Sequence, residues 1–183
     1  MKPLLVLEDT TRPSRRLFSV AGVDWWATRW AWVGPLFWIA LGLPLAWAEG
    51  GGALRGVGYG ILLWLTNTIH TLGHIGAGAL AGARMDAVVL TSTRDVDVYR
   101  GAKRDVPERV RVLRSLGGPA ANAAVGAAAL ALRAMAEGMP GPAGWLRAFG
   151  LFNAAVAIWT LMPVPTMDGW ILWRALLYRR KGG

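Results

Sequence analysis

Two histidines lie four residues apart inside a long uncharged segment, and they are the only histidines in the chain. His70 and His74 fall within residues 56–83, a run of 28 residues without Lys, Arg, Asp or Glu. If this run is helical, the interval of four places both imidazoles on one face, where they can bind a single divalent ion. The alternative is a neutral pair that hydrogen-bonds internally or to a backbone carbonyl. We favour metal binding, because ionisable residues inside apolar segments are costly and commonly functional.

A carboxylate that would complete such a site follows another apolar run. Asp168 comes directly after residues 148–167, where Pro163 and Pro165 cannot continue a helix. Irregular backbone at membrane depth is tolerated where it is buried in protein or lines a wet cavity, so we expect Asp168 to point inwards. Asp168 is also placed to cap the helix that follows, and the two roles are compatible. Two imidazoles and one carboxylate leave a fourth position for water, as in catalytic zinc sites.

The segments that carry these residues are long enough to cross a bilayer. Four runs contain no charged residue, and they hold 19, 28, 18 and 20 residues. About 20 residues of helix cross a hydrocarbon layer of ~30 Å. We therefore predict a membrane all-α fold with about four transmembrane helices, at approximately residues 30–48, 54–82, 115–133 and 146–163.

The overall composition is apolar and basic at once. The 183 residues are 54% hydrophobic and carry a formal net charge of +9, yet only 17% of them are charged. The apolar content excludes a disordered chain, and the sparse charges do not suit a nucleic-acid-binding surface. The absence of cysteine excludes a disulfide scaffold, a thiolate metal site and a cysteine nucleophile. We expect the lipid bilayer as a partner, and no nucleic acid.

Lys and Arg are distributed unevenly between the apolar runs. Seventeen of the twenty lie before the first run, between the second and third, or after the fourth. The positive-inside rule therefore places both termini and the central loop, residues 84–114, in the cytoplasm. We predict a cytoplasmic N-terminal segment at 1–29 and a single multi-pass membrane domain at 30–183. In this orientation the second and fourth spans both run inwards, which brings His70 and Asp168 to a similar depth.

The central loop contains two short stretches with strand character. Residues Ala87–Leu90 are apolar and rich in β-branched side chains, and Val96–Tyr99 alternates apolar and polar side chains. Both patterns are typical of β-strands. We expect a small β-containing cytoplasmic loop beside the helical membrane core.

Three motifs in this order resemble the site-2 protease family of intramembrane zinc metalloproteases. The family signature is H-E-x-x-H in one membrane helix, then G-P-x-x-N, then N-x-x-P-x-P-x-L-D-G. The corresponding segments here are His70–His74, Gly118–Asn122 and Thr160–Gly169. The resemblance covers roughly residues 54–178 and implies a site-2 protease-like core.

The resemblance also implies a set of site residues and a partner. Zinc would be held by His70, His74 and Asp168, and a β-containing loop would present the substrate in extended form. The substrate or binding partner would be the transmembrane segment of a membrane protein, cut by intramembrane proteolysis in active members of the family. The residues implied to contact that segment are Asn122, Thr160, Pro163 and Pro165.

Two departures from the family pattern fall at positions that carry chemistry. Thr71 stands where the family has the glutamate that takes a proton from zinc-bound water, and a Thr hydroxyl is no base near neutral pH. Thr160 replaces an asparagine. General acid–base catalysis is worth about 10²–10⁴-fold, so we predict impaired or absent peptidase activity. Asp86 and Glu108 are other carboxylates in the central loop, but nothing in the sequence directs either at the metal.

Three hypotheses about function follow. The first is a weakly active intramembrane zinc endopeptidase, which would make the chain a hydrolase. The second is a catalytically dead homologue, a pseudoenzyme that retains a zinc site and binds membrane segments or regulatory partners. The third is a metal-handling membrane protein that uses the same ligands without proteolysis.

Overall fold

Helices make up most of the protein, and a small sheet accompanies them. The structure is a computed structural model that describes residues 15–92, 95–101, 105–136, 138–165 and 167–179. In chain order the elements are β1 (Arg15–Val20), β2 (Val23–Ala27), α1 (Val33–Ala48), α2 (Ala53–Leu80), β3 (Ala87–Leu90), β4 (Asp95–Val98), α3 (Glu108–Met135), α4 (Pro140–Thr160) and α5 (Asp168–Arg179).

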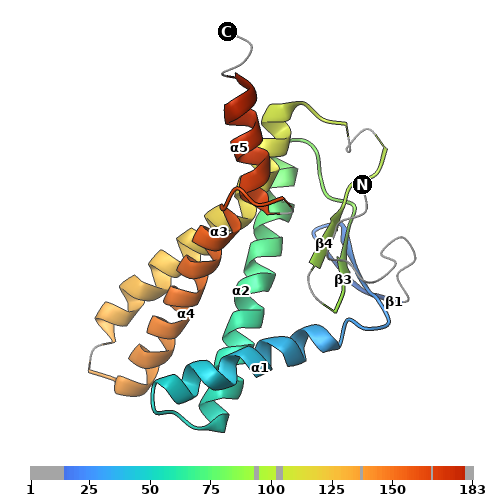
Figure 1. Cartoon of the computed structure of the whole chain (residues 1–183). Coiled ribbons are helices and arrows are strands. Elements are labelled where there is room, and N and C mark those ends of the chain that lie inside the picture. Colours follow the sequence, from blue (N-terminus) through green and yellow to red (C-terminus); the bar gives the residue numbers. More distant parts are fainter. Residues whose placement is uncertain (1–14, 93–94, 102–104, 137, 166, 180–183) are drawn as a thin grey trace.

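The long helix α2 is the element around which the others are arranged (Figure 1). Helix α1 crosses its N-terminal half, α3 and α4 lie together along it, and α5 packs against α3. Ala46, Tyr59 and Ala148 form a buried cluster that joins α1, α2 and α4. The rings of Trp145 and Phe152 both meet the Tyr59 ring edge-on. The three helices are therefore held together far from the histidines of α2.

Helices α2 and α3 approach each other closely at two glycines. A Cβ atom on Gly73 would collide with the backbone carbonyl of Gly117, and a Cβ on Gly117 would collide with that of Gly73. Because neither residue has a side chain, the two backbones can touch. This crossing lies between His70 and His74 on α2, and one residue before Gly118 on α3. It brings the histidine face of α2 against the second of the three motifs.

The four strands form one sheet in the order β1-β2-β3-β4. Strand β2 pairs in parallel with β3, and the other two pairings are antiparallel. The sheet packs against the C-terminal half of α2, where Ile75 lies in a buried cluster with Trp25 and Val88. The sheet therefore lies beside the same part of α2 that carries the histidines (Figure 1).

The prediction of a mostly helical protein with a small β element is confirmed, and both predicted strands are present as β3 and β4. The sheet is larger than predicted, because β1 and β2 come from the N-terminal segment. Helix α3 begins at Glu108, seven residues before the predicted span, and is continuous through the basic segment. Among the described helices, α3 alone is both long and apolar enough to cross a membrane. Membrane crossing by α1, α2, α3 and α4 stays a prediction.

Candidate metal site

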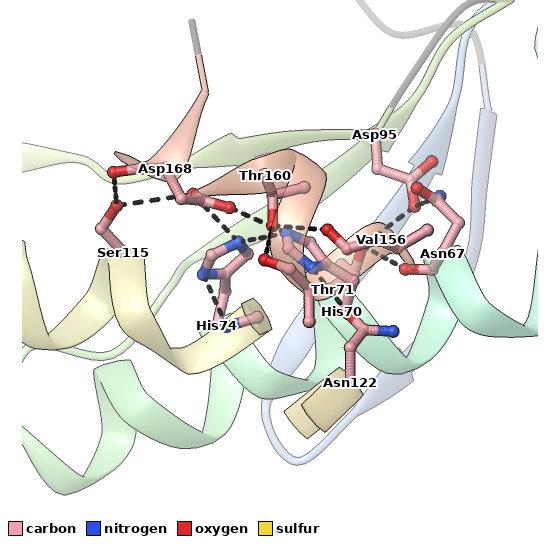
Figure 2. Close-up of polar contacts among 12 residues, drawn as sticks. Asn67, His70, Thr71, His74, Asp95, Ser115, Asn122, Val156, Thr160 and Asp168 are labelled. Carbon is pink, nitrogen blue, oxygen red and sulfur yellow. Dashed lines mark hydrogen bonds and ion pairs between the residues drawn. The ribbon is translucent and has the colours of Figure 1, made fainter. Parts of the chain in front are cut away.

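The three predicted metal ligands come together at the junction of α2, α3 and α5. Nε2 of His70 lies 2.9 Å from Oδ2 of Asp168, and Nε2 of His74 lies 3.3 Å from Oδ1 of the same carboxylate. The two Nε2 atoms are 3.1 Å apart. The three side chains thus converge on one point, although His70 and Asp168 are 98 residues apart in the sequence (Figure 2).

The other ring nitrogen of each imidazole, Nδ1, lies within hydrogen-bond distance of a carbonyl or amide oxygen. Such an oxygen can accept a hydrogen bond but cannot donate one. Nδ1 of His70 donates to Oδ1 of Asn122 at 2.7 Å, and Nδ1 of His74 donates to the carbonyl of Arg114 at 2.7 Å. The amide of Gly118 also approaches Nδ1 of His74, but at the longer distance of 3.3 Å. Protonation at Nδ1 leaves a lone pair on each Nε2, directed at the carboxylate.

This arrangement fits a divalent cation. Two Nε2 lone pairs and an ionised carboxylate are three acceptors, and no hydrogen is left between them. A cation placed among them satisfies all three, and two imidazoles with one carboxylate are a common ligand set for zinc. Space beside the imidazoles is kept open by Gly118, since a Cβ there would lie 2.5 Å from Nε2 of His70 and 2.7 Å from that of His74.

The orientation of Asn122 is fixed by a network of buried side chains. Its Nδ2 donates to the carbonyl of Thr66 at 3.0 Å and to Oδ1 of Asn153 at 2.8 Å. Nδ2 of Asn153 in turn donates to Oγ1 of Thr66 at 3.1 Å. Both asparagines and Thr66 are fully buried. With both amide hydrogens of Asn122 in use, only its oxygen can face His70.

Asp168 is positioned by the loop that the prolines create. After α4 the chain leaves the helix, and α5 begins at Asp168 itself. Gly169 packs directly on the backbone of Leu161, where any Cβ would overlap the carbonyl group. Oγ of Ser115 donates to the Asp168 carbonyl at 2.6 Å and lies 3.5 Å from its Oδ1. The proline loop and the α3 serine therefore direct the carboxylate to the imidazoles.

Thr71 is directed away from the ligands and towards the sheet. Its buried hydroxyl lies 3.0 Å from Oδ2 of Asp95 and 3.3 Å from the carbonyl of Asn67. Nδ2 of Asn67 also donates to Oδ2 of Asp95, at 3.0 Å. The residue at the position of the family glutamate thus binds a carboxylate contributed by β4 (Figure 2).

Of the four residues that the family resemblance implies for substrate contact, only some lie at the metal ligands. Asn122 lies at the site, whereas the Thr160 hydroxyl donates to the Val156 carbonyl within its own helix. Pro163 and Pro165 are exposed in the loop that precedes Asp168.

The two loop carboxylates considered from sequence lie elsewhere. Asp86 accepts the backbone N–H of Arg100, and Glu108 lines a cavity with Arg111 and Arg174 that does not include the ligands.

A cavity of about 290 Å³ adjoins the ligands. Besides the ligands His74 and Asp168, it is lined by residues of β4, the segment after it, α3 and α5, namely Asp97, Tyr99, Arg111, Arg114, Ser115 and Ile171. The guanidinium of Arg114 lies over the Tyr99 ring, 3.9 Å from its centre, and donates to the Ala83 carbonyl at 2.6 Å. These contacts connect the wall of the cavity to α3 and to the end of α2.

Sequence inspection missed the carboxylates of β4 and the amide of Asn153. The alternation over Val96–Tyr99 indicates a strand, and extended back to Asp95 it places the side chains of Asp95, Asp97 and Tyr99 on one face. That alternation indicates that the three side chains lie together, but it does not place them beside the histidines of α2. For Asn153, an amide inside an apolar helix was the corresponding signal.

No family model matches the sequence, and no curated protein matches it. Among solved structures, the chain is similar to a site-2 protease from Methanocaldococcus jannaschii, with a TM-score of 0.63 and 18% sequence identity. The similarity covers 92% of this chain and 73% of that one. The protein therefore has the fold of a site-2 protease.

Proposed function

We propose that this protein is an intramembrane zinc metallopeptidase homologue of the site-2 protease type, whose peptidase activity is reduced because Thr71 replaces the general base. The observation that carries the proposal is the convergence of two Nε2 atoms and the Asp168 carboxylate, with each Nδ1 bound to an acceptor. A pair of structural histidines would have no need for three acceptors directed at one point.

Each residue of the site has a role in this proposal. His70, His74 and Asp168 would hold zinc, which when bound polarises a substrate carbonyl and activates water. Asn122 and the Arg114 carbonyl keep the imidazoles in the tautomer that binds a metal. Thr71 supplies no base, so the proton transfers that peptide cleavage requires are slower.

The substrate class we propose is a transmembrane segment of a membrane protein, bound in extended form. Strand β4 supports this, because it is the last strand in the order β1-β2-β3-β4 and adjoins the cavity beside the ligands. An edge strand offers backbone donors and acceptors to an extended chain. A helical membrane segment would have to unwind locally to use them.

A second candidate is a protein that binds such a segment without cleaving it. The observation in its favour is that the Thr71 hydroxyl is engaged with Asp95 and Asn67 instead of facing the ligands. In this case the zinc site would stabilise the fold or anchor the bound segment.

Cleavage of membrane peptides by the full chain in detergent separates these candidates. The forms to compare are the wild type, Thr71→Glu and His70→Ala, each assayed with zinc on a panel of lysine-flanked transmembrane peptides. We expect slow cleavage by the wild type, faster cleavage by Thr71→Glu and none by His70→Ala. Binding without cleavage by the wild type would favour the second candidate. Equal cleavage by the wild type and His70→Ala would contradict the proposed site.

A further inference from the structure

Strand β4 and the residue that follows it present three side chains of alternate residues, Asp95, Asp97 and Tyr99, to the helices that carry the metal site. Side chains two residues apart lie on the same face of a strand. In the β3–β4 pairing, Asp95 lies opposite Leu90 and Asp97 lies opposite Val88. Val88 belongs to the cluster that packs on Ile75 of α2, and Leu90 and Tyr99 pack against that cluster. The face that carries Asp95, Asp97 and Tyr99 is therefore the face turned to α2.

The two ends of this face are anchored. At one end, Oδ2 of Asp95 accepts hydrogen bonds from Thr71 and Asn67, both at 3.0 Å. At the other end, the Tyr99 ring lies under the Arg114 guanidinium at 3.9 Å. Asp97 lies midway between the anchors, so its place relative to the ligands is set by contacts with both α2 and α3.

Asp97 lines the same cavity as His74 and Asp168. It does not belong to the group of ligand atoms that lie within 4.8 Å of one another, which among the described residues comprises His70, His74 and Asp168. A carboxylate that lines the metal cavity without joining the ligands lies on the wall of the space where water and substrate would meet, and exchanging protons with them is the task of an acid–base residue in a metallopeptidase. Asp95 is less suited to that role, because it lines a different cavity between α1 and the sheet.

We propose that Asp97 is the acid–base residue of this site. Its carboxylate, on strand β4, would take the role of the glutamate that is absent from position 71 of α2. The proposal rests on the zinc-peptidase function proposed above and deepens it. Thr71 is then a positioning residue, because its hydroxyl binds Asp95 and so holds the strand that carries the Asp97 carboxylate.

The reaction balances with water as the only co-reactant. The Asp97 carboxylate takes a proton from water as the water oxygen bonds to the carbonyl carbon of the scissile peptide. The C–N bond then breaks, and the leaving nitrogen takes the proton from Asp97. The carboxylate is regenerated, and one water is consumed for each peptide bond cleaved.

The first test compares the wild type, Asp97→Asn, Thr71→Glu and the double variant as full chains in detergent. The probe is a lysine-flanked Leu/Ala transmembrane peptide with a central Asn-Gly pair and a fluorophore–quencher couple. We expect Asp97→Asn to lower kcat by about 10²–10⁴-fold, the usual worth of general acid–base catalysis. Zinc content, and affinity for the peptide measured in EDTA, should stay at wild-type values. In the Thr71→Glu background the same substitution should cost much less.

The other possible results contradict either the role of Asp97 or the proposed function as a whole. If Asp97→Asn cleaves like the wild type, or if it loses zinc in proportion to activity, Asp97 is not the acid–base residue. If only Thr71→Glu cleaves, this inference is wrong, whereas the zinc site and the binding alternative stand. If no form binds zinc or cleaves, the proposed function fails and the inference fails with it.

A second test does not depend on turnover. The chain has no cysteine, so Asp97→Cys and Val98→Cys each carry a single thiol, on opposite faces of β4. In EDTA, saturating peptide should slow maleimide alkylation of the thiol at 97 several-fold and leave the thiol at 98 unaffected. Equal protection of both thiols, or none at 97, would overturn the placement of Asp97 at the peptide-binding cavity.

Discussion

At the scale of single residues, the site depends on the direction in which one amide points. Asn122 gives both hydrogens to α2 and α4, so its oxygen must receive the Nδ1 proton of His70. Mutation of residues that hold a metal-binding histidine in this way commonly lowers metal affinity by about 10–100-fold. Thr66 and Asn153 are therefore part of the site, although neither touches a ligand.

Replacement of Asn122 by Leu should lower zinc affinity about 10–100-fold, because the His70 ring loses the partner that fixes its tautomer. The measurement is a competitive zinc titration of the purified chain in detergent. Thermal unfolding of the metal-free protein controls for loss of the fold. Unchanged zinc affinity in a folded Asn122→Leu variant would contradict the role given to this amide.

The buried carboxyl of Asp95 should make the stability of the protein depend on pH. Burial, and to a lesser extent the nearby Asp97, raise the pKa of its carboxyl from 3.8 to about 6, although the bonds from Thr71 and Asn67 oppose the shift. The folded protein therefore holds this proton more tightly than the unfolded chain. Its contribution to stability is fully present below about pH 4 and is lost as the pH rises through about 6.

In Asp95→Asn the titrating group is gone, while the amide oxygen can still accept from Thr71 and Asn67. The variant should therefore be more stable than the wild type at pH 8, by about 1–3 kcal/mol, and equal to it near pH 4. Thermal unfolding midpoints across this pH range in detergent provide the measurement. A stability difference that does not change with pH would show that the Asp95 carboxyl is not buried as described.

At the scale of elements, the metal site depends on how closely α2 and α3 cross. Gly73 and Gly117 allow backbone contact at the level of the ligands, and Gly118 leaves room beside both Nε2 atoms. A larger residue at the crossing would separate the histidines of α2 from Ser115 and Asn122 of α3. The small residues therefore determine whether the second motif reaches the first.

Gly73→Ala should destabilise the protein by about 1–3 kcal/mol and weaken zinc binding, because its Cβ would meet the Gly117 backbone. Gly76→Ala is the matched control on the same helix, since a Cβ there has no neighbour within 4 Å. The control should be neutral, or more stable by up to about 1 kcal/mol through helix propensity. Thermal unfolding and zinc titration of both variants would test this. An equal loss in both would contradict the close crossing.

The elements were predictable to different degrees. Strands β3 and β4 show local alternation and β-branched residues, so both were expected. Strands β1 and β2 were not, because the parallel pairing of β2 with β3 joins segments about sixty residues apart, and no local pattern reports such a contact. A short basic helix opening at Pro107 was expected before the third span, but not its continuity with that span, because exposed Arg side chains on the first turns of α3 interrupt the apolar run without interrupting the helix.

At the scale of the whole molecule, the sheet lies on one side of α2, and α3 and α4 lie along another side (Figure 1). The ligands were predictable because their residue types are rare in apolar segments and occur in motif order. The β4 carboxylates were not, because their proximity to α2 arises from the packing of the sheet on Ile75. What the sequence missed is therefore the part of the site that depends on tertiary structure.

The predicted orientation places both termini in the cytoplasm. An alkaline phosphatase reporter fused after Gly183 should therefore be inactive, whereas one inserted at Gly51, between α1 and α2, should be active. Reporter activity in intact cells is the measurement, with immunoblots to show equal expression. Activity of the C-terminal fusion would contradict the orientation.

The claim on which the rest depends is that His70, His74 and Asp168 together hold zinc. Zinc bound per chain, measured by mass spectrometry after dialysis of the purified protein, tests it most directly. We predict one zinc per wild-type chain, the same in the control Asp86→Asn, whose carboxylate lies outside the site, and none in His70→Ala, His74→Ala or Asp168→Ala. A wild-type chain without zinc, or a His70→Ala chain that retains it, would contradict the account.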